Sequence, residues 1–251
     1  MTASPARTSP APTVILVSPQ LGENIGMVAR AMANFGLTDL RLVTPRDVWP
    51  NPKALAAASG ADWVVEGARV FSSTADAIAD LGLVLATTAR PREMAKPILD
   101  PQSAAERLAS RIDAGEKAGI LFGGERSGLD NDDVALADAV ITFPTDPAFS
   151  SLNLAQSVLL TGYEWFRTRG TQGGRTRQPP PPLAPKEDIQ RLFDHLESEL
   201  DAAGFLFPLA KRPTMVRNLR TIFLKAELSD QEVRSLRGVI RALAEFKHRR
   251  D

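Results

Sequence analysis

Apolar positions follow two different spacings over the first two thirds of the chain. Short apolar runs of strand length occur at residues 14–17, 40–43, 63–65, 83–86, 119–122 and 139–143. Segments with helical spacing lie between them, near residues 24–35, 51–59, 74–81, 101–112, 131–137 and 152–167. This alternation predicts an α/β fold, with a mostly parallel sheet and helices on both of its faces. A ligand is then expected at the carboxyl ends of the strands.

The segment at residues 24–35 has one apolar face and one cation opposite it. Its apolar residues share a helical stripe: Ile25, Val28, Met32 and Phe35. Gly36 follows as a residue that ends helices. At about 100° per residue, Arg30 points away from the stripe. A solvated surface arginine would explain this position, and so would a role in binding or catalysis.

The composition divides the chain into four parts. Residues 1–12 are a Ser/Thr/Pro/Ala-rich tail that we expect to be disordered, and residues 13–167 form the main α/β domain. Residues 168–185 are a linker rich in glycine, arginine and proline. Residues 186–251 contain three stretches with helical spacing, which predict a small C-terminal helical bundle. The third stretch begins at Ser229, where Glu232 completes a capping box.

Charge is unevenly distributed although the whole chain is neutral. Residues 1–166 carry 13 basic and 19 acidic residues, a net charge of −6. Residues 167–177 carry four arginines and no acid, and residues 178–251 have a net charge of +2. A nucleic acid needs local rather than overall positive charge, so this distribution suits an RNA held partly by the C-terminal part. A solvated linker beside a mixed helical surface would explain it equally well.

Several classes of protein are excluded by composition. The chain has no cysteine, which excludes a disulfide framework, a thiolate zinc site and a cysteine nucleophile. Its two histidines, His195 and His248, offer little for a metal site, so no metal is expected. No apolar run reaches the roughly 18 residues of a membrane span, and the N-terminus lacks the apolar core of a secretory signal. We therefore expect a cytoplasmic protein.

Three segments combine the residue types of a ligand site. They are Gly22–Arg30 (GENIGMVAR), Phe122–Leu129 (FGGERSGL) and Phe149–Ala155 (FSSLNLA). Glycine and other small residues allow backbone groups to approach a ligand closely. Each segment also has a structural explanation, because the glycines suit an ordinary strand-to-helix turn and Ser151 or Asn153 suits the capping of the next helix.

Together and in this order, the three segments resemble the SPOUT RNA 2'-O-ribose methyltransferases of the TrmH type. The resemblance covers residues 13–167 strongly and the remainder more loosely. It implies methylation of a tRNA ribose 2'-hydroxyl from S-adenosylmethionine, at nucleotide 32 of the anticodon loop, by a homodimer. It also implies a trefoil knot within about residues 119–167. The same chemistry on ribosomal RNA or at another tRNA position remains an alternative.

The resemblance also implies roles for individual residues. Those that match the family's cofactor loops are Thr87, Thr88, Ala89, Gly123, Phe143, Ser151, Leu152 and Asn153. Those that match its catalytic positions are Arg30, Asn24, Glu125 and Ser151. The family's arginine is described as the base that activates the ribose hydroxyl. A guanidinium stays protonated in proteins, so binding of the adjacent phosphate or stabilisation of the developing alkoxide is an equal alternative.

Asn24 and Glu125 each keep more than one interpretation. Asn24 could cap its own helix, or orient the cofactor loop and Arg30. Glu125 could bind the ribose or hold Arg30, and it could equally be an acid favoured by the first turn of a helix. Asp130, Asp132 and Asp133 suit the start of the helix near 131–137 better than a cation site.

RNA contacts are expected from Arg30 and from the C-terminal part. Arg217 and Arg220 are three residues apart and share one face of the second predicted C-terminal helix. Lys211 and Arg212 precede this helix and could extend the same patch.

The sequence argues against two other classes of protein. A non-catalytic RNA-binding protein of the same fold would be expected to lack Arg30 or the Ser151–Asn153 segment, and this chain has both. A nucleotide-binding oxidoreductase is disfavoured because no G-x-G-x-x-G sequence follows the strand predicted at residues 14–17.

Overall fold

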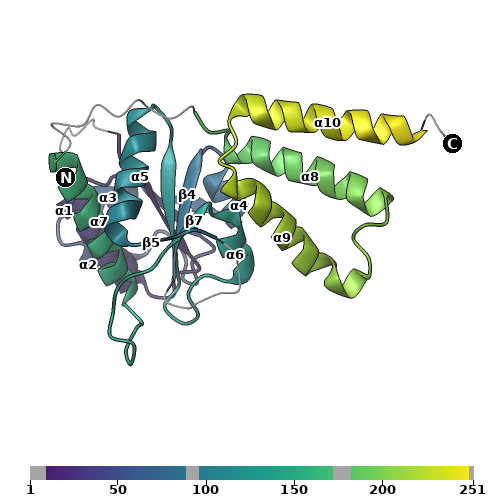
Figure 1. Cartoon of the computed structure of the whole chain (residues 1–251). Coiled ribbons are helices and arrows are strands. Elements are labelled where there is room, and N and C mark those ends of the chain that lie inside the picture. Colours follow the sequence, from purple (N-terminus) through teal and green to yellow (C-terminus); the bar gives the residue numbers. More distant parts are fainter. Residues whose placement is uncertain (1–9, 89–95, 172–181, 249–251) are drawn as a thin grey trace.

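A parallel sheet forms the centre of the main domain in the computed structural model, which describes residues 10–88, 96–171 and 182–248 (Figure 1). Within these residues the sheet has seven strands in the order β3-β2-β1-β6-β4-β7-β5, and every neighbouring pair is parallel. The strands are β1 (Thr13–Val17), β2 (Leu40–Val43), β3 (Arg69–Phe71), β4 (Leu83–Thr87), β5 (Ile98–Leu99), β6 (Ala118–Gly123) and β7 (Ala139–Ile141).

Helices cover both faces of the sheet, as its alternating side chains require. Val14 and Leu16 of β1 face one core, and Ile15 and Val17 face the other. The first core packs against α1 (Gly22–Asn34), α2 (Pro52–Ala58), α3 (Asp62–Glu66), α5 (Pro101–Asp113) and α7 (Leu154–Thr171). The second core packs against α4 (Thr74–Ile78) and α6 (Asn131–Leu136). The predicted α/β fold with helices on both faces is confirmed.

The remaining helices extend from one side of this domain (Figure 1). They are α8 (Lys186–Ala202), a short 3-10 turn (Leu209–Lys211), α9 (Arg212–Lys225) and α10 (Asp230–His248). Their own small core includes Ile189, Leu192, Phe193, Leu224 and Val233. The predicted capping box at the start of α10 is present, since Ser229 N–H donates to the Glu232 carboxylate at 2.7 Å.

Backbone and ionic contacts attach these helices to their own main domain. The N–H of Lys186 donates to the carbonyl of Leu81 at 2.8 Å, and that of Glu187 to Ala79 at 3.1 Å. The Lys186 ammonium donates to both oxygens of Asp138, and these two side chains are only 6% and 4% exposed. The C-terminal helices and the sheet are therefore joined by a buried ion pair.

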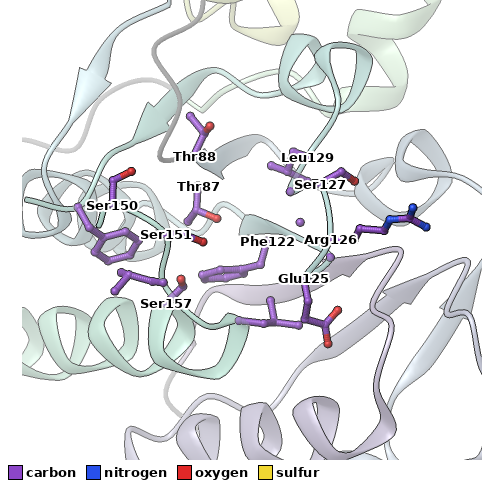
Figure 2. Close-up of a pocket in the computed structure, with 16 residues that line it drawn as sticks. Thr87, Thr88, Phe122, Glu125, Arg126, Ser127, Leu129, Ser150, Ser151 and Ser157 are labelled. Carbon is purple, nitrogen blue, oxygen red and sulfur yellow. The ribbon is translucent and has the colours of Figure 1, made fainter. Parts of the chain in front are cut away.

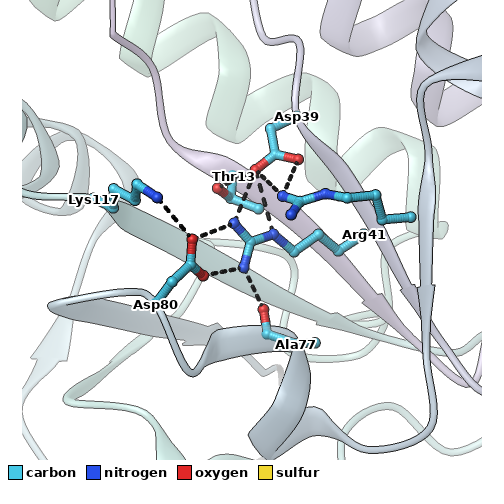
Figure 3. A network of polar contacts seen from close by, with 7 residues as sticks. Thr13, Asp39, Arg41, Ala77, Asp80 and Lys117 are labelled. Carbon is cyan, nitrogen blue, oxygen red and sulfur yellow. Dashed lines mark hydrogen bonds and ion pairs between the residues drawn. The ribbon is translucent and has the colours of Figure 1, made fainter. Parts of the chain in front are cut away.

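A second ionic network ties β2 to the helix layer beneath it (Figure 3). The Arg41 guanidinium is 3% exposed and lies 3.1 Å from Asp39 and 2.5 Å from Asp80. Burial acts to raise the pKa of Asp80, but hydrogen bonds from Arg41 and Lys117 outweigh it and lower this pKa to about 2. A charged residue inside an otherwise apolar strand is thus satisfied by two carboxylates.

The sequence prediction was wrong at one strand. Residues 63–65 belong to α3, whose Val64 and Val65 are buried against the first core. The third strand follows instead at Arg69–Phe71, where Val70 is 50% exposed at the edge of the sheet. Three apolar residues suit a buried helical turn as well as a strand. The two-residue β5 was not predicted.

Some expectations lie beyond what the structure describes. Residues 1–9 of the predicted tail and residues 172–181 of the predicted linker are outside the described residues. The helix expected near residues 152–167 runs from Leu154 to Thr171. The trefoil knot stays a prediction.

Candidate active site

Three loops meet at the carboxyl edge of the sheet and enclose one cavity (Figure 2). The loops follow β4, β6 and β7, which are neighbours in the sheet, so their carboxyl ends lie side by side. The cavity is lined by Thr87, Thr88, Phe122 to Leu129, Phe143, Ser150 to Leu152, Leu154 and Ser157. The ligand position predicted from the strand order therefore coincides with a cavity.

The residues expected to bind a cofactor divide into three groups. Thr87, Thr88, Gly123, Phe143, Ser151 and Leu152 line the cavity. Asn153 lies next to this lining, at the start of α7. Ala89 is outside the described residues. The Thr87 hydroxyl donates to the carbonyl of Leu121 at 3.0 Å, which fixes the end of β4 against β6.

The glycines of the loop after β6 are required by close backbone contacts. A Cβ on Gly123 would lie 2.1 Å from the backbone of Gly128, and one on Gly124 would lie 2.2 Å from the carbonyl oxygen of Ser18. The loop folds back on itself, with the N–H of Gly128 donating to the carbonyl of Gly124 at 2.9 Å. Gly128 has a φ of +68°, a conformation that favours glycine. These contacts form one wall of the cavity.

Glu125 connects this loop to the start of α1. Its carboxylate accepts from the backbone N–H of Gln20 at 2.7 Å and of Leu21 at 3.3 Å, and from the Asn24 side-chain amide at 2.6 Å. Leu21 occupies the N-cap position of α1 and has no capping side chain of its own. Glu125 therefore supplies the acceptor that the beginning of this helix lacks.

Asn24 extends the connection to the third loop. Its side-chain oxygen accepts from the Asn153 amide at 3.3 Å, while its own amide donates to Glu125. Asn153 also caps α7, because its side-chain oxygen accepts from the N–H of Ala155 at 2.8 Å. One hydrogen-bonded chain, Glu125–Asn24–Asn153, thus joins all three motif segments.

The glycines of the first motif segment have a packing function. A Cβ on Gly26 would lie 2.2 Å from the carbonyl oxygen of Ala54, and one on Gly22 would lie 2.6 Å from the Asn51 side chain. Both residues let α1 approach α2 closely. They contribute to the site by positioning α1, without contacting the cavity.

Arg30 lies on the exposed side of α1, as the helical spacing predicts. It is six residues beyond Asn24, which is about 9 Å along the helix axis. Arg30 is not part of the cavity lining, and it forms no hydrogen bond or ion pair with any described residue. Glu125 and Ser151 line the cavity, Asn24 is hydrogen-bonded to Glu125 behind this lining, and Arg30 lies apart from all three.

Several lining residues were not singled out from the sequence. They include Phe122, Arg126, Ser127, Leu129, Ser150, Leu154 and Ser157. Most of them lie within the motif segments, so membership of a loop at a strand end was the available signal. Arg126 points away from the group formed by Thr87, Phe122 and Ser151 (Figure 2).

The four C-terminal cations expected to bind RNA are far along the chain from this cavity, and three are already paired. Arg212 is 2.6 Å from Asp201, Arg217 is 3.0 Å from Asp132, and Arg220 is 2.7 Å from Glu197. Lys211 is exposed. Within the described residues, no group of three histidine or acidic side chains could hold a metal ion, and no helix is long and apolar enough to cross a membrane. Asp130 caps α6 together with Asp133, as predicted.

Both the main domain and the C-terminal helices match known protein families. A model of the SpoU rRNA Methylase family matches residues 11–163, and a model of the C-terminal domain of tRNA methyltransferase TrmJ matches residues 187–251. A tRNA (cytidine/uridine-2'-O-)-methyltransferase TrmJ from Cronobacter sakazakii is 35% identical over 235 residues, which are 92% of this chain and 94% of the relative.

Solved structures agree with this assignment. The crystal structure of TrmJ from Z. mobilis ZM4 is 51% identical with a TM-score of 0.84, and the match covers 93% of this chain and 99% of that one. A structure described as giving insights into the 2-OH methylation of C/U34 on tRNA is 27% identical with a TM-score of 0.52. That match covers 64% of this chain and 97% of the other. The chain therefore belongs to the SpoU rRNA methylase family and, within it, to the TrmJ-type tRNA methyltransferases.

Proposed function

We propose that this protein transfers a methyl group from S-adenosylmethionine to a ribose 2'-hydroxyl of tRNA, at nucleotide 32 of the anticodon loop. The observation that carries the proposal is the cavity at the carboxyl ends of β4, β6 and β7, connected through Glu125–Asn24–Asn153 to the helix of Arg30. Membership of the TrmJ-type enzymes supplies the reaction class. The enzyme would act in the cytoplasm, where tRNA is modified.

The lining of the cavity fits the cofactor. Phe143 and Leu152 offer apolar surface for a nucleobase, and the serine hydroxyls and loop backbone offer donors and acceptors for a ribose. Glu125 is one of the lining residues and forms no ion pair with any described residue, so its negative charge suits a cationic sulfonium. When bound, the cofactor supplies a methyl group whose transfer breaks a carbon–sulfur bond and forms a carbon–oxygen bond, without a metal.

The residues of the chain then have positioning tasks. Glu125, Asn24 and Asn153 hold the three loops at fixed distances from one another, and orientation of two reactants is a large part of the rate gain in such displacements. Arg30 provides a permanent positive charge for the phosphate beside the target ribose or for the developing alkoxide. The hydroxyl proton leaves to a phosphate oxygen or to water.

We further propose that Arg30 serves the cavity of a second copy in a homodimer. Arg30 lies outside the cavity of its own chain. Beside it, α1 exposes Met27, and the adjoining helix α7 exposes Leu159, Leu160, Tyr163 and Phe166 at helical spacing. Exposed apolar side chains gathered in this way mark a protein interface. An interface on this surface would cover the apolar residues and bring Arg30 to the partner.

The TrmJ relative covers more of this chain than the structure concerned with C/U34 does, which favours a TrmJ-type substrate over one methylated at position 34. The relative from C. sakazakii matches nearly the whole chain, including the C-terminal helices. The structure that concerns C/U34 matches 64% of this chain along almost its entire length, so about a third of this chain has no counterpart in it. Methylation at position 34 or of ribosomal RNA is the alternative outcome.

The test is to incubate the purified protein with unmodified tRNA transcripts, S-adenosylmethionine and EDTA, and to map 2'-O-methyl groups by mass spectrometry. We expect one methyl group at nucleotide 32 and full activity in the chelator. Product at nucleotide 34 would overturn the proposed position, and activity that requires added zinc would overturn the metal-free mechanism. Light scattering during size-exclusion chromatography should give twice the 27.1 kDa chain mass.

A further inference from the structure

An open groove on the C-terminal helices is lined by three arginines from a single helix. Arg234, Arg237 and Arg241 of α10 recur at intervals of three and four residues, so they share one helical face over about 10 Å. Gly238 lies among them and lines the same groove, and Asp188 of α8 lies across from them. We call Arg234, Arg237, Gly238 and Arg241 the α10 arginine face.

Two of these arginines have no partner in the part of the chain that the structure describes. Arg237 and Arg241 form no hydrogen bond or ion pair with any described residue, although Glu245 lies one turn beyond Arg241. Arg234 is paired with Asp230 on its own helix. The groove acid Asp188 is already satisfied by Arg191 at 2.5 Å. The α10 arginine face therefore keeps positive charge available for an external anion.

Gly238 is the second, independent feature of this groove. It lies in the middle of a 19-residue helix, where glycine is less favourable than any other residue except proline. It is exposed, and a Cβ built on it would meet nothing within 4 Å in the described residues. Packing within the chain thus gives no reason for a glycine, whereas close approach of a ligand backbone does.

The arginines of the neighbouring helix α9 differ from Arg237 and Arg241 because they are paired with carboxylates. These arginines form ion pairs within the chain, since Arg212 pairs with Asp201 and Arg217 with Asp132. Arg220 pairs with Glu197 and lies over the ring of Phe193, 5.2 Å from its centroid. Cations held by carboxylates would have to break these pairs before they could bind a phosphate.

We propose that the α10 arginine face is where the C-terminal helices bind the phosphate backbone of the tRNA substrate. The proposal rests on the proposed function, because the partner is the RNA that is methylated. Unpaired guanidiniums bind phosphates with two parallel hydrogen bonds, and a helix without a side chain at Gly238 lets the nucleic-acid backbone lie close between them. The groove is open, as a polyanion lying along the helix requires.

The charge component is tested with two matched double variants of the full-length protein. Arg237→Ala/Arg241→Ala removes two charges from α10, and Arg212→Ala/Arg217→Ala removes two from α9. The affinity for an unmodified tRNA transcript is measured by fluorescence anisotropy over a range of salt concentrations. For the α10 variant we expect the slope of log affinity against log salt to fall by about 1 to 2 units, and for the α9 variant by less than about half a unit. The reverse order would overturn the proposal.

The steric component is tested with Gly238→Leu, and Val239→Phe adds bulk to an exposed position about 100° around the helix from Gly238, on the side away from the three arginines. Gly238→Leu should raise the melting temperature, because leucine favours a helix, and should still weaken tRNA binding about tenfold. Val239→Phe should bind tRNA like the wild type. Normal tRNA binding by Gly238→Leu would overturn the proposal, since nothing then approaches the helix at that point.

Methylation assays distinguish a failure of the α10 arginine face from a failure of the proposed function. At saturating tRNA, the α10 variant should methylate with the turnover of the wild type and a raised KM, because its substitutions are remote from the cavity. Absence of 2'-O-methyl product from the wild-type protein itself would count against the proposed function. Wild-type KM in the α10 variant, with normal methylation, would count against the α10 arginine face alone.

Discussion

Glu125, at the carboxyl ends of the strands, accepts hydrogen bonds from two backbone N–H groups and one amide, whereas Asp138, at their amino ends, accepts from the Lys186 ammonium. Both carboxylates join parts of the chain that are distant in sequence. Glu125 connects a loop to α1, and Asp138 connects β7 to α8. Asp138 also accepts from the N–H of Val84 at 2.8 Å. The two carboxylates differ in their partners: Lys186 neutralises the charge of Asp138, whereas Glu125 forms no ion pair with any described residue.

That difference separates a structural carboxylate from one available for binding. A buried charge opposite a buried counter-ion is cancelled locally, and its field does not extend to a ligand. A carboxylate held by neutral donors keeps its net charge while its position is fixed, which is the arrangement that electrostatic binding of a cation needs. We therefore propose that the cavity end of the sheet binds a ligand, whereas the opposite end attaches the C-terminal helices.

The largest expected effect comes from breaking the ion pair at the amino end. Asp138→Asn should lower the free energy of unfolding by about 3–5 kcal/mol, because it leaves the Lys186 ammonium buried without a counter-charge. Denaturant unfolding monitored by circular dichroism would measure this loss. The double variant Asp138→Asn/Lys186→Met should recover much of the stability, since it removes the isolated charge. A double variant less stable than the single one would contradict this account of the junction.

The next effect concerns catalysis by Arg30. Arg30→Ala should reduce turnover at least a hundredfold, about 2.7 kcal/mol of transition-state stabilisation, while unfolding changes by no more than about 0.5 kcal/mol. Steady-state methylation assays and denaturant unfolding measure the two quantities. Arg69→Ala, at an exposed arginine on the edge strand β3, serves as the control and should keep full turnover. Near-normal turnover in Arg30→Ala would make Arg30 a solvated surface residue.

How much of this arrangement the sequence could predict depends on the range of the interactions. Strands such as residues 14–17 and 83–86 are runs of consecutive apolar residues and were predictable locally. The cavity was predictable because loops at the ends of parallel strands must meet. The contact between Asn24 and Glu125 joins residues 101 positions apart, and no local pattern indicates it.

The ion pairs of the C-terminal helices also join residues that are distant in sequence, so local patterns could not predict them. Helical spacing correctly placed Arg217 and Arg220 on a helix. It could not show that Asp132 and Glu197, on two other helices, pair with these two arginines. The unpaired cations on α10 are recognisable only from the side-chain contacts of the arginines that the structure describes.

A smaller effect tests directly whether Glu125 and Asp138 have different roles. Glu125→Gln should lower the free energy of unfolding by only about 0.5–1.5 kcal/mol, because a neutral amide oxygen can still accept from the donors around it. Affinity for S-adenosylmethionine should fall about tenfold through loss of the charge, as measured by isothermal titration calorimetry. A stability loss as large as that of Asp138→Asn, with unchanged cofactor affinity, would remove the distinction between the two ends of the sheet.

The smallest effect uses a third carboxylate, Asp80, which pairs with cations like Asp138 but is 41% exposed (Figure 3). Its pKa in the folded protein is lowered to about 2, where burial is outweighed by the hydrogen bonds from Arg41 and Lys117. A lowered carboxyl pKa stabilises the folded state above the unfolded value near 4, and this stabilisation is lost as the pH falls from about 4 to 2. Solvent screening limits it to about 1 kcal/mol. Urea unfolding at pH 6 and pH 3 should show this contribution in the wild type, and the Asp80→Asn variant should lack it. An identical pH response in the two proteins would mean that the exposed pair contributes nothing, and that burial alone sets the strength of the ion pairs at this end of the sheet.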